Sequence, residues 1–208
     1  MKCDCLIVGV GGQGVLSIAS VIAQSAVKSG FLVRQSEVHG MAQRGGAVLA
    51  HLRLAELSGT LCRKSSAESS ENSQGIAGDF VPRGEADLII SMEPLESLRY
   101  LSWLSPHGMV VSSADAMINI PNYPEKEKIE NAVKSLPKSM LINAEKLAKE
   151  AGLLKTVNMV MVGASSPFLP ISPEILESTI IEIFTGKDPK LADLNKKAFI
   201  LGCKASHL

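Results

Sequence analysis

The stretch MKCDCLIVGVGGQGV, residues 1–15, predicts the architecture of this chain. An apolar run at residues 5–8 leads into Gly9, Gly11 and Gly14, which have the spacing G-x-G-x-x-G, and a helical pattern follows. A strand, a glycine turn and a helix in this order can bind phosphate, because amides at a helix N-terminus carry partial positive charge. An α/β domain that only needs a tight turn would show the same residues. The motif alone therefore leaves a phosphate site and a purely structural turn equally open.

The residues of this turn have different expected roles. Gly9 permits the tight turn, Gly11 lets backbone amides approach an anion, and Gly14 lets the helix pack closely on the strand. The candidate cofactor-binding residues are therefore Gly9, Gly11, Gly12, Gln13 and Gly14.

The composition argues against several classes of protein. The chain of 208 residues is long enough for one well-filled domain, and its net charge of zero with 4% aromatic residues argues against nucleic-acid binding. No apolar run approaches the roughly 18 residues of a membrane span and no signal peptide is evident, so we expect a cytoplasmic protein without membrane contact. The cysteines form no C-x-x-C pair, which argues against a metal site. Cys3 and Cys5 share one face of the expected first strand and are interpreted as small buried residues.

Strand-like and helix-like segments alternate along the chain. The expected strands cover residues 5–8, 31–33, 47–54, 86–91, 108–111 and 139–142, and the expected helices cover residues 14–29, 94–104, 125–135, 144–151, 156–163, 172–184 and 191–203. This alternation predicts one α/β domain over residues 1–208, with a Rossmann-like, mostly parallel sheet and helices on both faces. A Ser-rich stretch predicts a flexible loop at residues 57–80.

A second unusual stretch, residues 36–46, is polar and punctuated by glycines. It follows the second expected strand, and in an open α/β sheet the loops after the strands line the binding crevice. His39 could carry a proton and Arg44 could bind a carboxylate or phosphate, although a plain loop histidine and a surface ion pair are the alternatives. The candidate ligand or subunit contacts are Glu37, His39, Gln43, Arg44, Gly45 and Gly46.

The sequence fits a dinucleotide-binding enzyme poorly. An acid that holds the ribose is expected about 20 residues after the glycines, but residues 34–36 are Arg-Gln-Ser and Glu37 comes late. This disfavours NAD, whereas Arg34 leaves NADP open. No G-x-S-x-G, H-E-x-x-H or P-loop motif is present, so we assign no catalytic residue. Such a chain is typical of a component of a larger enzyme.

Two stretches, GVGGQG at residues 9–14 and HGMAQRGG at residues 39–46, resemble the gamma-type component of the 2-oxoacid:ferredoxin oxidoreductases. The sequence SEVHG at residues 36–40 is more similar to the small (beta) subunit of the indolepyruvate branch. Further similar stretches are GEADLI at 84–89, EPLESLRY at 93–100, IPNYP at 120–124, Asn158, and GA at 163–164. The resemblance spans most of the chain and departs at residues 57–78, where the family makes a shorter connection.

This resemblance implies a function that the residues alone do not show. The complexes oxidatively decarboxylate aryl pyruvates, form acyl-CoA and carbon dioxide, and reduce ferredoxin. The large (alpha) subunit holds thiamine diphosphate and the iron–sulfur clusters, whereas the gamma-type component is Rossmann-like and helps to assemble the complex or to handle coenzyme A. The resemblance therefore implies a chain without a cofactor of its own that works with a large subunit and, through the complex, with ferredoxin.

Two roles for the glycine stretches stay open at this point. In the first role, amides of residues 11–14 would receive a phosphate-bearing group such as coenzyme A, with Arg44 near it. In the second role, both loops would form a docking surface for the large subunit. A free-standing NADP-dependent reductase and a scaffold that binds no small molecule are the alternatives to the subunit function.

Overall fold

The computed structural model of the chain describes residues 1–40, 45–56, 76, 78–186 and 188–206. Within these ranges one six-stranded sheet has the order β2-β3-β1-β4-β5-β6. Its strands are β1 (Lys2–Val10), β2 (Phe31–His39), β3 (Ala47–Glu56), β4 (Ala86–Ser91), β5 (Leu104–Ser113) and β6 (Ser139–Ile142). β1, β4, β5 and β6 are parallel neighbours, whereas β3 is antiparallel to both β1 and β2. The expected mostly parallel sheet is confirmed.

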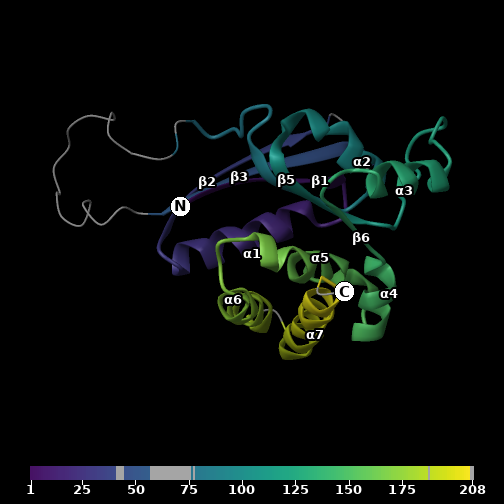
Figure 1. The fold of residues 1–208 in the computed structure, drawn as a ribbon. Helices are drawn as coiled ribbons and strands as arrows, with labels where there is room; N and C mark the ends of the chain where they lie inside the picture. The colour runs from purple at the N-terminus through teal and green to yellow at the C-terminus, as the bar shows by residue number, and fades with distance from the viewer. Residues whose placement is uncertain (41–44, 57–75, 77, 187, 207–208) are drawn as a thin grey trace.

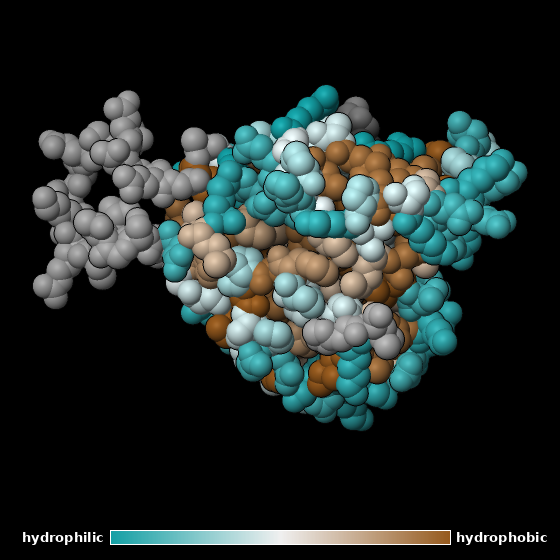
Figure 2. All heavy atoms as spheres, in the orientation of Figure 1, coloured by the Kyte–Doolittle hydropathy of each residue, from teal (hydrophilic) through white to brown (hydrophobic). Residues whose placement is uncertain are grey.

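Helices cover both faces of this sheet, as expected. They are α1 (Val15–Lys28), α2 (Pro94–Arg99), α3 (Lys126–Lys134), α4 (Ala144–Ala151), α5 (Val157–Ser165), α6 (Pro173–Thr185) and α7 (Pro189–Ala205). Figure 1 shows α2 and α3 on one face and the other five on the opposite face. On the side drawn in Figure 2, hydrophilic residues gather over α3, so the outer face of that helix meets solvent. No helix in the described ranges has the length and apolar character needed to cross a membrane.

The strand, glycine turn and helix expected at residues 1–29 are present. β1 is a central strand, and its residues 5–8 are fully buried, as expected for a strand that is covered on both faces. α1 directs Ile18 and Ile22 into the core beneath the sheet. Gly30 follows with a φ of 82°, the left-handed conformation that ends a helix, so α1 ends where the sequence indicates.

The arrangement of β2 and β3 could not be read from the sequence. Residues 36–39 were expected in a loop, but β2 continues to His39 because it pairs with β3 in an antiparallel hairpin, Glu37 opposite Ala50 and His39 opposite Val48. The loop prediction for these residues is wrong. β3 consequently lies between β1 and β2, and β2 forms an edge of the sheet. A dinucleotide-binding fold instead places its second strand directly beside the first.

The expected helix at residues 94–104 is also shorter. α2 ends at Arg99 and a 3₁₀ turn spans Leu101–Trp103, because β5 starts at Leu104 by pairing with β4. The rings of Tyr100 and Trp103 lie 5.5 Å apart and pack against a cluster of buried apolar side chains from β1, β4 and β5, on the sheet face that α2 covers. Both aromatic side chains are therefore packing residues.

Buried polar side chains fix the connection that follows β3. His51 and Arg53 lie two residues apart on β3, so their side chains share one face of the strand, and both are buried. The Arg53 guanidinium binds the Asp4 carboxylate, with Nε 2.9 Å from Oδ1, and also donates to the carbonyl oxygen of Phe80. The Val81 amide donates to His51 Nδ1 at 3.1 Å. These bonds anchor the chain as it returns across the sheet toward β4.

Part of the predicted loop at residues 57–80 can be compared with the structure. Residues 57–75 and 77 lie outside the described part. Phe80 packs edge-on against the His51 ring, with centroids 5.0 Å apart, and Asp79 binds Arg34 on β2 at 2.8 Å. The end of the segment is therefore held on the sheet.

α5 and α7 are packed more closely than side chains would allow. A Cβ added at Gly163 would lie 2.1 Å from the carbonyl oxygen of Phe199, and one at Gly202 would lie 2.0 Å from that of Val160. Real Cβ atoms do not approach a carbonyl oxygen so closely, so the two backbones touch because each helix has a glycine at the contact. Figure 1 shows α5 near the sheet and α7 beyond it, on the side away from the sheet.

Candidate functional site

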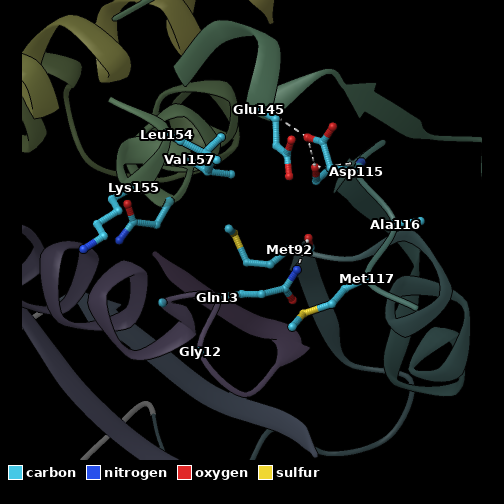
Figure 3. A pocket seen from close by; sticks show the side chains of 13 residues that line it. Gly12, Gln13, Met92, Asp115, Ala116, Met117, Glu145, Leu154, Lys155 and Val157 are labelled. Atoms are coloured by element: carbon cyan, nitrogen blue, oxygen red, sulfur yellow. Dashed lines mark hydrogen bonds between the residues drawn. The ribbon is translucent and has the colours of Figure 1, made fainter. Parts of the chain in front are cut away.

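A cavity of about 570 Å³ lies where β1, β4 and β5 end at their carboxyl termini. This is the edge of a parallel sheet at which α/β proteins bind ligands. Figure 3 shows side chains from the glycine turn, the β4–α2 and β5–α3 connections and the starts of α4 and α5 around it. Its lining residues are Gly12, Gln13, Gly14, Met92, Ser113, Asp115, Ala116, Met117, Glu145, Leu154, Lys155, Val157 and Asn158.

The glycine turn that borders the cavity is closed by its own side chain. Gln13 Oε1 accepts the Val10 amide at 2.7 Å, and Gln13 Nε2 donates to the Met92 carbonyl oxygen at 3.1 Å. A Cβ at Gly9 would lie 3.0 Å from Gln13, Met92 and Val15, so Gly9 is where the tight turn admits no side chain. The expected role of Gly9 fits this geometry.

Gly11 and Gly14 play different parts from those expected. The Gly11 amide donates to the Gly46 carbonyl oxygen at 2.8 Å, so it is not offered to an anion. Gly14 is the N-cap of α1 with a φ of 84°, and a Cβ there would lie 3.0 Å from Asn158 Nδ2. The close approach at Gly14 is therefore to α5 rather than to β1, which corrects the sequence interpretation.

The structure brings only part of the second glycine stretch to this turn. Gly46 joins it through Gly11, and the Gly45 carbonyl oxygen accepts Asn119 Nδ2 at 2.8 Å. Glu37 and His39 lie on the edge strand β2, where their side chains approach to 3.4 Å, and neither lines the cavity. Gln43 and Arg44 lie outside the described residues, so their assignment stays a prediction.

Two carboxylates in the cavity wall were missed by the sequence interpretation. Asp115 follows β5, and its Oδ2 accepts both the Ser113 hydroxyl at 2.8 Å and the Glu145 amide at 2.7 Å. Asp115 thereby caps α4 from another part of the chain, and Glu145 stands in the first turn of that helix. An acid directly after a buried parallel strand was the available signal, because such strand ends meet at one edge of the sheet.

Residues 93–100 and 120–124, two of the stretches that resemble the oxidoreductase family, meet beside the cavity. The Tyr123 hydroxyl donates to Glu93 Oε1, and Glu93 Oε2 accepts the Glu96 amide as the N-cap of α2. Burial, and then the neighbouring Glu93, raise the pKa of Tyr123, and burial raises the pKa of Glu96. These bonds tie the connection between β5 and α3 to the start of α2.

Apolar side chains are exposed around the mouth of the cavity. Ile118 is 76% exposed, Leu154 45% and Met117 38%. Leu154 and Met117 line the cavity from opposite connections, and Ile118 is next to Met117 in the chain. Within the described ranges no group of three His, Cys, Asp or Glu side chains could hold a metal ion.

Comparison with known proteins gives consistent results. The chain matches the model of the family described as pyruvate ferredoxin/flavodoxin oxidoreductase over residues 4–205. Indolepyruvate oxidoreductase subunit IorB from Pyrococcus horikoshii is 37% identical over 97% of this chain and 94% of that protein. The protein of the same name from Archaeoglobus fulgidus is 32% identical over the same shares.

Two solved structures share the fold. The gamma subunit of a keto/oxoacid ferredoxin oxidoreductase from Geobacter sulfurreducens has a TM-score of 0.67 at 19% identity, covering 99% of this chain and 98% of that one. A 2-oxoglutarate:ferredoxin oxidoreductase from Magnetococcus marinus, solved with 2-oxoglutarate, coenzyme A and succinyl-CoA bound, has a TM-score of 0.72 at 17% identity. There the match covers 99% of this chain but 31% of the other.

Proposed function

Because the chain belongs to the pyruvate ferredoxin/flavodoxin oxidoreductase family, we propose that it is the small subunit of an indolepyruvate-type 2-oxoacid:ferredoxin oxidoreductase. The observation that carries this proposal is the 37% identity to a subunit of that name over 97% of this chain. The common gamma subunit of the pyruvate and ketoisovalerate oxidoreductases of Pyrococcus abyssi is only 25% identical over 91% of it. The difference favours an aryl pyruvate as the substrate of the complex.

The proposed division of labour puts the redox chemistry in the partner. The complex decarboxylates the oxoacid, transfers the acyl group to coenzyme A, and passes the electron pair left by decarboxylation to ferredoxin. Thiamine diphosphate and the iron–sulfur clusters belong to the large subunit. The described residues of this chain do not fit a cluster, because Cys3 and Cys5 are buried side by side and no third metal ligand joins them. The complex is expected to work in the cytoplasm.

The geometry argues against the alternative of a free-standing NADP-dependent reductase. Its ribose and phosphate contacts would come from a strand beside β1, but β3 occupies that place and runs antiparallel. Arg34, the candidate for an NADP phosphate, is on the edge strand and binds Asp79. Neither feature supports a dinucleotide at the glycine turn.

The geometry also bears on the two roles proposed for the glycine stretches. The Gly11 amide is occupied by Gly46, and Gln13 fills the turn, which supports docking of the large subunit over phosphate binding at Gly11. Coenzyme A at the N-terminus of α1, with Arg44 near it, stays a prediction.

Reconstitution with the large subunit tests this function. Coexpressed subunits are expected to purify as one complex that reduces ferredoxin with indolepyruvate and coenzyme A, in preference to pyruvate or 2-oxoglutarate. The chain on its own is expected to be inactive and to give no heat with NADPH in calorimetric titration. Tight NADPH binding by the isolated chain, or a complex that prefers pyruvate, would contradict the proposal.

A further inference from the structure

The cavity at the carboxyl edge of the sheet has negative groups on one wall. Asp115 Oδ2 is used within the fold, but within the described residues Oδ1 has no hydrogen-bond partner. Glu145 is partly exposed, and its side chain points toward the middle of the cavity in Figure 3. Its Oε2 also accepts Lys149 Nζ at 3.4 Å in an exposed ion pair, and exposed pairs of this kind contribute little energy. A bound group that approaches this wall therefore meets negative charge.

The remaining walls are mainly apolar. The larger apolar side chains that line the cavity are those of Met92, Met117, Leu154 and Val157. Two of them are methionines, whose flexible thioethers adapt to the shape of a partner. Lys155 also lines the cavity, but in Figure 3 its ammonium group extends away from the centre. The cavity thus combines an adaptable apolar lining with carboxylates at one side.

This combination fits a cation better than a phosphate. A phosphate would be repelled by two carboxylates, and the Gly11 amide that would attract it is bonded to Gly46. A lysine or arginine would find a carboxylate partner, and an apolar neighbour would be buried against the methionines. The volume of about 570 Å³ is in the range of pockets that bury a drug-sized molecule, which is also enough room for a few side chains.

We propose that this cavity receives a segment of the large subunit in which a lysine or arginine stands next to a large apolar side chain. The cation pairs with Asp115 and Glu145, and the apolar side chain packs on Met92, Met117 and Leu154. The exposed Ile118 at the mouth of the cavity extends the same contact. This inference rests on the proposed function, because it identifies the docking site of that partner.

Charge and shape variants in the coexpressed complex test the docking site. Glu145→Lys reverses the charge in the cavity, Glu145→Gln removes it, and Glu150→Lys is the matched control on the exposed side of the same helix. Leu154→Asp disrupts the apolar wall, and Val27→Asp, at another exposed apolar residue on α1, is its control. Association of each small subunit with the purified large subunit is measured at low and at high salt.

Glu145→Lys and Leu154→Asp are each expected to weaken association about tenfold or more, with Glu145→Gln in between. Both controls are expected to stay within about twofold of the unmodified chain. The effect of Glu145→Lys, but not that of Leu154→Asp, is expected to shrink at high salt, since salt screens charge pairs.

The outcomes distinguish a failure of the docking site from a failure of the proposed subunit function. Normal association of both Glu145→Lys and Leu154→Asp would overturn the docking site and leave the subunit function intact. Tighter binding of coenzyme A by Glu145→Lys with unchanged association would also overturn it, because the cavity would then be a phosphate site. If the unmodified chain does not associate with the large subunit at all, the proposed function itself fails.

Discussion

The helix layer and the carboxyl edge of the sheet are held together by different means. In the helix layer, α5 and α7 touch backbone to backbone at Gly163 and Gly202. At the sheet edge, side chains such as Gln13, Asp115 and Tyr123 connect one loop to another through hydrogen bonds. A backbone contact tolerates no added atom, whereas a hydrogen-bonded connection tolerates changes of shape but responds to lost partners and to protonation. The first region should therefore determine stability and the second should determine how the binding edge is arranged.

The largest expected effect comes from adding one methyl group to the helix contact. Gly163→Ala or Gly202→Ala forces α5 and α7 apart, because the new Cβ would overlap a carbonyl oxygen of the other helix. We expect a loss of about 3 kcal/mol in the free energy of unfolding, measured by denaturant titration of the isolated chain. Gly186→Ala is the control, since nothing lies within 4 Å of its Cβ position. Equal stability of Gly163→Ala and the control would refute the close contact.

The second largest effect is expected at the hydrogen-bonded loops on the carboxyl edge of the sheet. Tyr123→Phe keeps the ring but leaves the buried Glu93 carboxylate without this donor, and we expect a loss of about 2 kcal/mol. Tyr100→Phe is the matched control, because within the described residues the Tyr100 hydroxyl makes no hydrogen bond. The stabilities of the two variants are compared by thermal unfolding. If both variants lose the same amount of stability, the Tyr123–Glu93 bond does not stabilise the carboxyl edge of the sheet.

A smaller effect should appear with pH at the connection after β3. Burial, and then the neighbouring Arg53, lower the pKa of His51 below its ordinary value of 6.5, and the ring accepts the Val81 amide only when it is neutral. Below about pH 6.5 the unfolded chain takes up this proton before the folded one does, so stability falls as the pH decreases. His51→Asn keeps an acceptor but does not titrate. We expect it to reduce the loss of stability between about pH 8 and pH 5, and an unchanged loss would contradict this role.

The smallest effect is expected at a surface ion pair between the helices. Lys28 Nζ of α1 lies 2.5 Å from Glu182 Oε2 of α6, but both side chains are more than a third exposed. Lys28→Met should therefore change the free energy of unfolding by no more than about 0.5 kcal/mol, measured in the same titrations. A larger loss would mean that charge pairs, and not the glycine contact, hold the helix layer.

Local patterns in the sequence predict most of the elements but not how they meet. The apolar run, the glycine turn and the helix after it are correctly placed because each depends on neighbours in the chain. The polar residues 36–39 look like a loop, yet they form a strand because β3 pairs with them from outside the local window. The same limit applies to Gly163 and Gly202, since nothing in the sequence around either glycine indicates the helix that it faces.

The candidate site was predicted in outline. The edge of the sheet and the glycine turn are where the motif indicates, but the Gly11 amide is occupied by a residue 35 positions further on. Asp115 and Glu145 are 30 residues apart and meet only because β5 ends beside the start of α4. Contacts at this range depend on the order of the strands, which a single sequence leaves open.

The central position of β1 has a consequence for folding during synthesis. Its residues 5–8 are apolar on both faces and need β3 on one side and β4 on the other, where Cys5 pairs with Leu88. The ribosome makes β1 before either partner, so its apolar surface stays uncovered until β4 has emerged. Such a nascent chain is a candidate for chaperone binding over this interval, and its folding rate should be limited by these long-range pairings.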